Sequence, residues 1–311
     1  MSILLPSTWG VRVTAKLEFG CIAELVGRGG VKSETLLDDN RRTIELLQGH
    51  FNAVWFDDHF HKDGAPVFES WTTLSYLASQ YPQMRFGTLV LCQSYRNPGL
   101  LAKMMATLQV LTSGRFIAGI GAGWKEDEYQ AYNYPFPSSK IRIEQLEELA
   151  KILKIMWAQS PASFEGKHFR ITQAECEPLP HPPPPLLIGG GGEKLTLRVV
   201  ARHADWMNIA FPEIATFQHK LSVLKEHCLE VGRTYEDIKK SIWTYVEIKE
   251  SEGTTGIDTR NRHFISGTPE QVAIELRDFS EAGVQHIMIR FVDFPGTRMA
   301  KRFIEEVIPR L

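Results

Sequence analysis

The segment Trp55–His61 (WFDDHFH) places several titratable side chains directly after a short apolar run. The imidazole of a histidine changes its charge near neutral pH, so His59 could give or take a proton during a reaction. The alternative is a structural role, in which the His59 ring is simply hydrogen-bonded to Asp58. The segment on its own leaves both interpretations open.

A metal site is a third interpretation of the same residues. His59 and His61 have the spacing of the paired histidines in metal-dependent hydrolase barrels. Such a site also needs histidines at later strand ends and a final aspartate. Only Asp293 stands at a suitable place, so we predict no metal ligands here.

Glycine and aromatic residues crowd a second segment, Gly119–Tyr129 (GIGAGWKEDEY). Small residues let the backbone approach a planar ligand closely, and Trp124 could form an aromatic wall beside it. The structural alternative is a glycine-rich turn that carries a partly buried tryptophan.

A third segment has four consecutive glycines, Gly189–Gly192, after an apolar run and before a helical pattern. Such a turn exposes backbone N–H groups at the positive end of a helix, which suits a phosphate group. It is not a dinucleotide fingerprint, because Lys194 or Leu195 stands where a third glycine belongs. A purely structural turn is the alternative. A fourth segment, Thr88–Pro98, contains Arg96, which could bind an anion or cap a loop.

Strand patterns and helix patterns alternate along the whole chain. The sequence predicts eight strands, at Leu17–Ala23, Ala53–Phe56, Met84–Leu91, Arg115–Ile120, Pro185–Ile188, Asp205–Ala210, Ser241–Ile248 and His286–Phe291. Helical spacing is clearest at Pro98–Leu111, Ser139–Trp157, Glu193–Arg202, Glu213–Val231, Pro269–Ala282 and Thr297–Val307. Eight such alternations favour a closed (β/α)₈ TIM barrel over an open sheet, and they place the chemistry at the carboxyl ends of the strands.

We expect one domain over residues 16–311, with an N-terminal extension at 1–15. Insertions are predicted at about 160–184, lying over the barrel, and at about 250–266. Irregular segments of that length often act as functional lids.

Composition narrows the possible partners. The formal net charge of −2 gives no electrostatic reason to bind nucleic acid or an anionic membrane. No apolar run approaches the roughly 20 residues of a membrane helix. Four widely spaced cysteines and an N-terminus without a signal-peptide pattern lead us to expect a cytoplasmic protein with reduced thiols.

Taken together and in order, two stretches resemble the luciferase-like (bacterial luciferase superfamily) oxidoreductases. They run from Tyr95-Arg96-Asn97-Pro98 to Gly121–Tyr129, and from Pro184-Pro185 through Gly189–Glu193 to Ala201–Asp205. The resemblance extends from about Leu17 over nearly the whole chain. The GAGW-x-E-x-E-Y form looks most similar to the branch that uses the deazaflavin coenzyme F420.

The resemblance implies roles for individual residues. His59 would stand near the reactive ring as a proton donor, and a bulge at Leu89–Val90, often with a non-proline cis peptide, would press on the ring face. Gly121–Gly123 would pass beneath the cofactor and Gly189–Gly192 would hold its phosphate. The expected cofactor-binding residues are Asp58, Thr88, Leu89, Val90, Gly121, Ala122, Gly123, Trp124, Glu128, Gly189, Gly190, Gly191 and Gly192.

The sequence departs from one part of the family pattern. Sugar-phosphate dehydrogenases of this branch carry an acidic residue where Trp124 stands, and a lysine beyond the sixth strand, where this chain has Ala210-Phe211-Pro212. A sugar phosphate is therefore not the expected substrate. We predict hydride transfer between F420 and another small organic molecule. FMN with dioxygen, in a two-component monooxygenase, is the alternative, and a cofactor-free ligand-binding barrel is a second one. A flavin or F420 reductase is an expected partner. The resemblance also implies a homodimer.

Overall fold

The computed structural model describes residues 17–27, 31–251, 256–257 and 262–311. The extension expected at residues 1–15 lies outside the described residues, as does part of the insertion expected at 250–266.

Eight parallel strands form a closed barrel, as predicted. The barrel strands are β1 (Glu18–Ile22), β2 (Ala53–Phe56), β3 (Arg85–Thr88), β5 (Phe116–Gly121), β8 (Leu186–Gly189), β9 (Trp206–Ala210), β10 (Lys239–Ile248) and β13 (His286–Phe291). Each pairs in parallel with the next, and β13 pairs back onto β1 to close the ring. Beyond the ring, β11 (Gly256–Ile257) and β12 (His263–Gly267) extend the sheet beside the end of β10.

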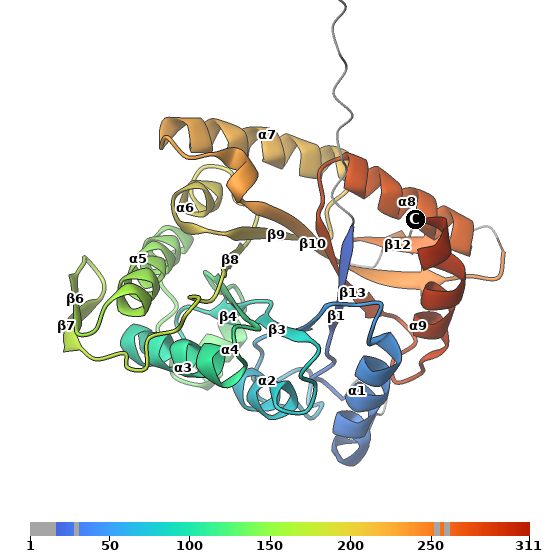
Figure 1. Cartoon of the computed structure of the whole chain (residues 1–311), viewed down its shortest axis with the longest axis horizontal. Helices are drawn as coiled ribbons and strands as arrows, with labels where there is room; N and C mark the ends of the chain where they lie inside the picture. The colour runs from blue at the N-terminus through green and yellow to red at the C-terminus, as the bar shows by residue number, and fades with distance from the viewer. Residues whose placement is uncertain (1–16, 28–30, 252–255, 258–261) are drawn as a thin grey trace, which may run out of the picture.

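Helices surround the barrel (Figure 1). They are α1 (Ser33–Leu47), α2 (Ser70–Ala78), α3 (Pro98–Leu111), α4 (Glu126–Ala131), α5 (Ser139–Ala158), α6 (Thr196–His203), α7 (Ile214–Glu230), α8 (Pro269–Glu281) and α9 (Arg298–Arg302). Short helical turns follow at η2 (Tyr235–Asp237), η3 (Phe303–Val307) and η4 (Ile308–Arg310). Pro98 and Pro269 occupy the first turns of α3 and α8, where a missing N–H costs no hydrogen bond.

Side chains alternate between the inside and the outside of the barrel. On β2, Trp55 packs inside, whereas Phe56 points out toward the helices. The Trp55 ring fills the barrel centre so closely that a Cβ on Gly20 or Gly87 would lie 2.3 Å from it. Glycine on β1 and on β3 is thus the counterpart of a large side chain on the strand between them.

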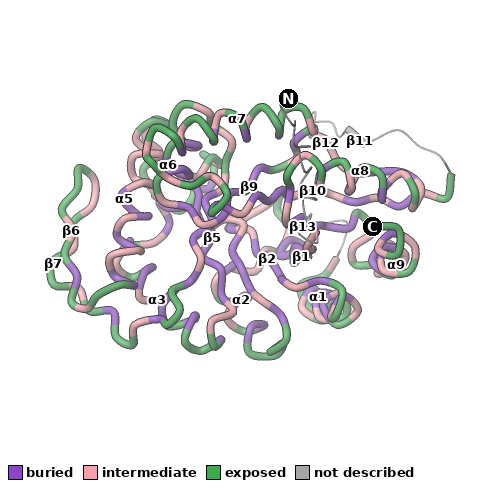
Figure 2. Tube along the Cα trace, turned by 45° about the horizontal axis from the view of Figure 1, so that its top comes forward, coloured by how far each residue is buried: buried purple, intermediate pink, exposed green. Residues whose placement is uncertain are grey.

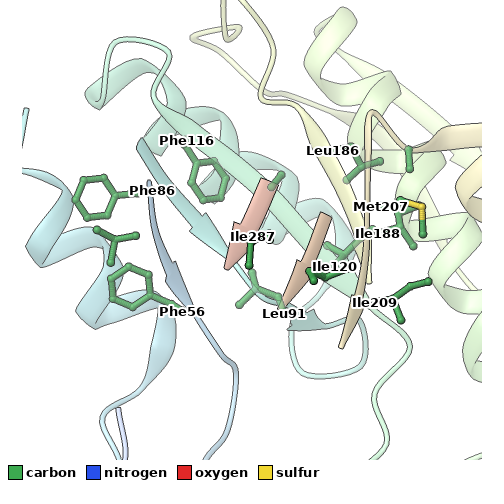
Figure 3. Packing of buried hydrophobic residues seen from close by; sticks show 14 of the residues in the cluster. Phe56, Phe86, Leu91, Phe116, Ile120, Leu186, Ile188, Met207, Ile209 and Ile287 are labelled. Atoms are coloured by element: carbon green, nitrogen blue, oxygen red, sulfur yellow. The ribbon is translucent and has the colours of Figure 1, made fainter. Parts of the chain in front are cut away.

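The larger core lies between the strands and the helices (Figure 3). Phe86, Phe116 and Ile188 are among its fully buried members. Burial is concentrated on the strands and on the inner faces of the helices, while the outer helical faces are exposed (Figure 2).

The third predicted strand, Met84–Leu91, is interrupted. β3 ends at Thr88, and pairing with β5 resumes only at β4 (Leu91–Cys92). Between them, the Thr88 hydroxyl donates to the carbonyl of Gly119 at 2.7 Å and accepts from its N–H at 2.8 Å. Leu89 and Val90 do not pair with β5 and form a bulge, while the N–H of Leu89 still donates to the carbonyl of Phe56 on β2 at 2.7 Å.

The insertion near residues 160–184 forms a hairpin of β6 (Ala162–Glu165) and β7 (Arg170–Ala174). The expectation that it lies over the barrel is wrong: Figure 1 shows the hairpin at the outer edge of the molecule, beyond α5. The carboxylate of Glu148 on α5 holds it there by accepting from the N–H groups of Lys167, His168 and Phe169. Helix α6 also begins later than predicted, at Thr196 instead of Glu193.

The amino end of the barrel is closed by a compact polar cluster. His286 is fully buried and accepts a hydrogen bond from Trp55 Nε1 at 3.1 Å. Glu18 accepts from Lys239 Nζ at 2.6 Å and from Asn52 Nδ2 at 2.7 Å. All four cysteines are free and buried, and none of the described helices is long and apolar enough to cross a membrane.

Candidate active site

His59 and Glu128 meet at the carboxyl ends of the strands. His59 follows β2 and Glu128 lies on α4 after β5, yet His59 Nδ1 is 3.1 Å from Glu128 Oε2. An ionised carboxylate only accepts hydrogen bonds, so Nδ1 carries the proton of this bond. The arrangement leaves His59 Nε2 as the nitrogen that can exchange a proton with a bound molecule.

Glu128 is itself held by several donors. Its side chain is buried and accepts from the N–H of Phe60 at 2.9 Å and from the Tyr95 hydroxyl at 3.2 Å. Lys125 Nζ stands 3.4 Å away. These contacts fix the carboxylate, which in turn fixes the orientation of the His59 ring.

Charges around His59 favour its protonated form. Burial opposes the charge, but the hydrogen bond that His59 donates to Glu128 and the nearby Asp57 and Asp58 carboxylates outweigh it and raise the pKa of His59. For Glu128, burial is again opposed by the hydrogen bond and charge of His59, which hold its pKa at about 2. Both shifts favour an imidazolium paired with a carboxylate.

Asp58 does not bind His59, so the structural alternative in its predicted form is wrong. The Asp58 carboxylate accepts from Arg96 Nη1 at 2.8 Å, Arg96 Nη2 at 3.0 Å and the N–H of Cys92 at 2.9 Å. Arg96 also bonds Glu69 at 2.6 Å. Arg96, with a side chain that is 11% exposed, thus links Asp58 on the loop after β2 to Glu69 at the start of α2, and Asp58 holds the chain that precedes His59.

Val90 and two glycines form a tight cradle beside this pair. The Leu89–Val90 peptide is cis, as the family resemblance implied. A Cβ on Gly121 would lie 2.5 Å from Val90 Cγ2, and one on Gly189 would lie 2.9 Å from Val90 Cγ1. The Val90 side chain, which follows β3, thus packs directly on the backbone of Gly121 at the end of β5 and of Gly189 at the end of β8.

An aromatic wall stands over the histidine. The Trp124 side chain is 67% exposed and its ring meets the His59 ring edge-on at 5.9 Å. Gly123 has φ +76°, and a Cβ there would collide with the Tyr129 hydroxyl. The partly buried Trp of the structural alternative is thus not what the structure contains. An exposed tryptophan beside a charged histidine is free to contact a ligand.

The four-glycine turn packs more closely than the sequence implied. A Cβ on Gly190 would lie 3.1 Å from Thr196 Cγ2, and one on Gly192 would lie 2.9 Å from Thr196 Oγ1. The Gly191 carbonyl accepts from Lys220 Nζ at 2.8 Å, and Lys220 also pairs with Glu193 at 3.1 Å. Packing alone accounts for these glycines, so phosphate binding by this turn stays a prediction. The structure adds Lys220 to the groups that lie at the turn.

Sequence reasoning missed Arg290. This side chain is 3% exposed on β13, and its Nη2 donates to Asp57 Oδ2 at 3.2 Å and to the Ala23 carbonyl at 3.1 Å. A signal was present, since Arg290 is a single charge inside the otherwise apolar strand His286–Phe291. Among the described residues, no group of three His, Cys, Asp or Glu side chains could hold a metal ion.

Comparison with known proteins places this geometry in a family. The model of the luciferase-like monooxygenases matches residues 17–254. The chain belongs to the luciferase-like monooxygenase family. Curated members include an F420-dependent glucose-6-phosphate dehydrogenase of Amycolatopsis mediterranei, 25% identical over 306 residues that cover 84% of this chain and 90% of that protein. An F420-dependent hydroxymycolic acid dehydrogenase of Mycobacterium tuberculosis is 32% identical over 128 residues, which cover 40% of this chain and 35% of that protein.

Solved structures of luciferase-like proteins share the fold. An F420-dependent secondary alcohol dehydrogenase in complex with an F420-acetone adduct superimposes with a TM-score of 0.81, at 20% identity, covering 95% of this chain and 99% of that one. An EDTA monooxygenase from Chelativorans superimposes with a TM-score of 0.76, at 14% identity, covering 94% and 92%. At these identities the likeness concerns the barrel alone.

The residues present fit a flat, phosphate-bearing tricyclic cofactor. The Val90 side chain lies on the backbone of Gly121 and Gly189, and the contacting rings of His59 and Trp124 belong to the same carboxyl end of the barrel. By contrast, Asp58, Thr88 and Glu128 are buried and bonded within the protein. Direct contact between these three side chains and a cofactor stays a prediction; what they do here is shape the site.

Proposed function

We propose that this protein is an F420-dependent oxidoreductase that transfers a hydride between the coenzyme and a small organic substrate. The observation that carries the proposal is the His59–Glu128 pair at the carboxyl end of the barrel, where the cis peptide Leu89–Val90 places the Val90 side chain against Gly121 and Gly189. Curated relatives that cover most of the chain are named as F420-dependent dehydrogenases.

F420, when bound, supplies the hydride chemistry. The protein orients the reacting molecules and handles the accompanying proton. In the direction of carbonyl reduction, the substrate carbon gains the hydride while His59 Nε2 gives its proton to the substrate oxygen. In alcohol oxidation the neutral His59 takes that proton back. Glu128 stabilises the imidazolium in both directions.

The substrate proposed is not a sugar phosphate, although several relatives are named for glucose 6-phosphate. Trp124 replaces an acidic residue next to His59. Beyond β9, where a lysine was expected for such a substrate, Phe211 packs on Trp243 with ring centroids 4.3 Å apart. The Phe211 ring itself carries no charge for a phosphate, and the cation that lies there is Arg262, 4.6 Å from the centre of that ring.

An FMN-dependent monooxygenase is the second candidate, and the family description favours it. Fluorescence titration of the purified protein with F420, and separately with FMN, under low oxygen distinguishes the two. Tight F420 binding with weak FMN binding supports the proposal. Tight FMN binding with no F420 binding overturns it and makes oxygen consumption the next assay.

We also propose that the protein works as a cytoplasmic homodimer, with a flavin or F420 reductase as its partner. Light scattering on the purified protein tests the dimer, and a mass of one chain at working concentration would contradict it.

A further inference from the structure

Lys125 attaches the loop after β2 to the segment that carries Trp124. It follows Trp124 directly and comes just before α4, and its side chain is 12% exposed. Its Nζ donates to the carbonyl of His61, on the loop after β2, at 3.1 Å. The N–H of Phe60 on the same loop donates to Glu128 Oε1 at 2.9 Å. The loop is thus bonded to the start of α4 through both a carbonyl and an N–H group.

The same ammonium shares one carboxylate oxygen with the His59 imidazole. Glu128 Oε1 lies 3.2 Å from His59 Nδ1 and 3.4 Å from Lys125 Nζ. An imidazolium and an ammonium beside one oxygen repel each other, although the carboxylate attracts both. The Glu128 side chain is only 1% exposed, so water screens this arrangement weakly. Lys125 therefore offsets part of the negative charge that Glu128 presents to His59.

The two carboxylates on the loop of His59 are each paired with an arginine. Asp57 accepts from Arg290 Nη2 at 3.2 Å, and Asp58 accepts from Arg96 Nη1 at 2.8 Å. Each arginine also pairs with a second carboxylate, Glu24 for Arg290 and Glu69 for Arg96. A guanidinium does not lose its proton in a protein. These two cations therefore keep their charge over the whole range in which a histidine titrates.

Lys125 is the corresponding cation at the third carboxylate, that of Glu128. The Tyr95 hydroxyl adds a neutral donor, 3.2 Å from Glu128 Oε2. Lys125 also has a second carboxylate, Asp127 at 2.9 Å, whose side chain is 60% exposed. An ion pair with so exposed a partner is strongly screened by water. Replacing Lys125 would thus remove a charge beside Glu128 and leave both arginine pairs in place.

We propose that Lys125 is a positioning residue for the proton donor. Its ammonium holds the loop of His59 against the segment of Trp124 and, through the shared Glu128 oxygen, makes His59 release its proton more readily than the His59–Glu128 pair alone would. A donor that holds its proton too tightly is a poor general acid. The use of that proton in hydride transfer rests on the proposed function, whereas the effect of Lys125 on the histidine does not.

The test is an NMR titration of the His59 imidazole in the full-length protein, with H59A to assign the signal. K125M keeps a side chain of similar length without the charge, so the pKa of His59 should lie at higher pH than in the wild type. K125R keeps a cation there and should return the pKa toward the wild-type value. K239M is the matched control, because Lys239 is 22% exposed and bonds the carboxylate of Glu18 at the amino end. It should leave the His59 signal where it is.

An unmoved or lowered pKa of His59 in K125M would overturn the proposal. A K125R or K239M signal that moves as far as that of K125M would overturn it as well, since the effect would then not come from the charge at this position. K125Q is the second neutral variant in case K125M does not fold, with the same upward movement expected. F420 titration of the wild type separates the two proposals: absence of F420 binding would refute the proposed function, while the histidine titration still decides the role of Lys125.

Discussion

His59 and His286 lie at opposite ends of one barrel, and their pKa values move in opposite directions. At the carboxyl end, carboxylates raise the pKa of His59. At the amino end, burial lowers the pKa of His286 to about 4, with Lys239 and Arg85 adding to the effect and Glu18 opposing it. The surroundings thus favour the charged form of the histidine at one end, where we propose the proton donor, and the neutral form at the other.

The difference comes from what surrounds each ring. His59 has Glu128, Asp57 and Asp58 around it, and its side chain stays 24% exposed. His286 has no exposed surface, and its Nε2 accepts from Trp55 Nε1, a group that can only donate. A proton on that nitrogen would break the bond. Burial disfavours the charged form of both rings. Only around His59 do neighbouring carboxylates outweigh that effect, so the neighbours of each ring, more than its burial, decide which histidine can donate a proton.

The largest expected effect comes from H59A. Loss of the proton donor should lower turnover of any ketone or alcohol that the wild-type enzyme accepts by about 10²–10⁴-fold. F420 affinity should stay unchanged, since the backbone surface that would hold the ring is intact. Steady-state kinetics with F420 titration checks both quantities. An equal loss of turnover and of F420 affinity would remove His59 from the role of proton donor.

H286A should affect stability instead. Removal of the ring leaves a cavity and an unpartnered Trp55 N–H, at a cost of about 2–4 kcal/mol in the free energy of unfolding. Urea denaturation at neutral pH measures this, with H59A as the matched control at the other end. The folded variant should keep the wild-type turnover number. A lower turnover number in folded H286A would contradict a purely structural role for the histidine at the amino end.

The pH dependence of stability follows from the same lowered pKa. The unfolded chain binds a proton at His286 near pH 6.5 and the folded protein only near pH 4, so stability is present above 6.5 and is lost as pH falls through that window. The difference amounts to at most about 3 kcal/mol. The raised pKa of His59 acts with the opposite sign and above pH 6.5. Because H286A lacks the ring that titrates between pH 6.5 and about 4, it should lose most of the acid sensitivity of stability in that range.

A smaller effect is expected from E128Q. The amide keeps the shape of the side chain but removes the negative charge that raises the pKa of His59. In carbonyl reduction, activity should fall as pH rises through the His59 pKa, and the midpoint should move to lower pH in the variant. In alcohol oxidation activity should instead rise as pH rises through the His59 pKa, and the midpoint should again move to lower pH in the variant. A pH–rate profile with an unmoved midpoint would show that Glu128 does not set this charge.

The regular parts of the molecule were predictable because local periodicity determines them. The segment Ala53–Phe56 was placed as a strand with both ends correct, and Pro98–Leu111 as a helix likewise. The third strand was predicted as one piece, because the Thr88–Gly119 bonds that interrupt it join residues 31 positions apart. No local pattern contains that information.

The candidate site shows the same limit. His59 followed from its place after a strand, but its partner Glu128 lies 69 residues away and was predicted only as a cofactor contact. Arg290 escaped notice because its meaning depends on Asp57, 233 residues earlier. Gly20 and Gly87 have no motif at all, and only the Trp55 ring between them explains their type.

The opposite states of the two histidines are tested most directly by an NMR titration of the imidazole resonances of the folded protein, with H59A and H286A to assign the signals. We predict that the His59 signal titrates above the ordinary histidine value of 6.5, and that the His286 signal stays neutral down to about pH 4. A His59 that titrates below His286 would contradict the assignment of the proton donor to the carboxyl end of the barrel.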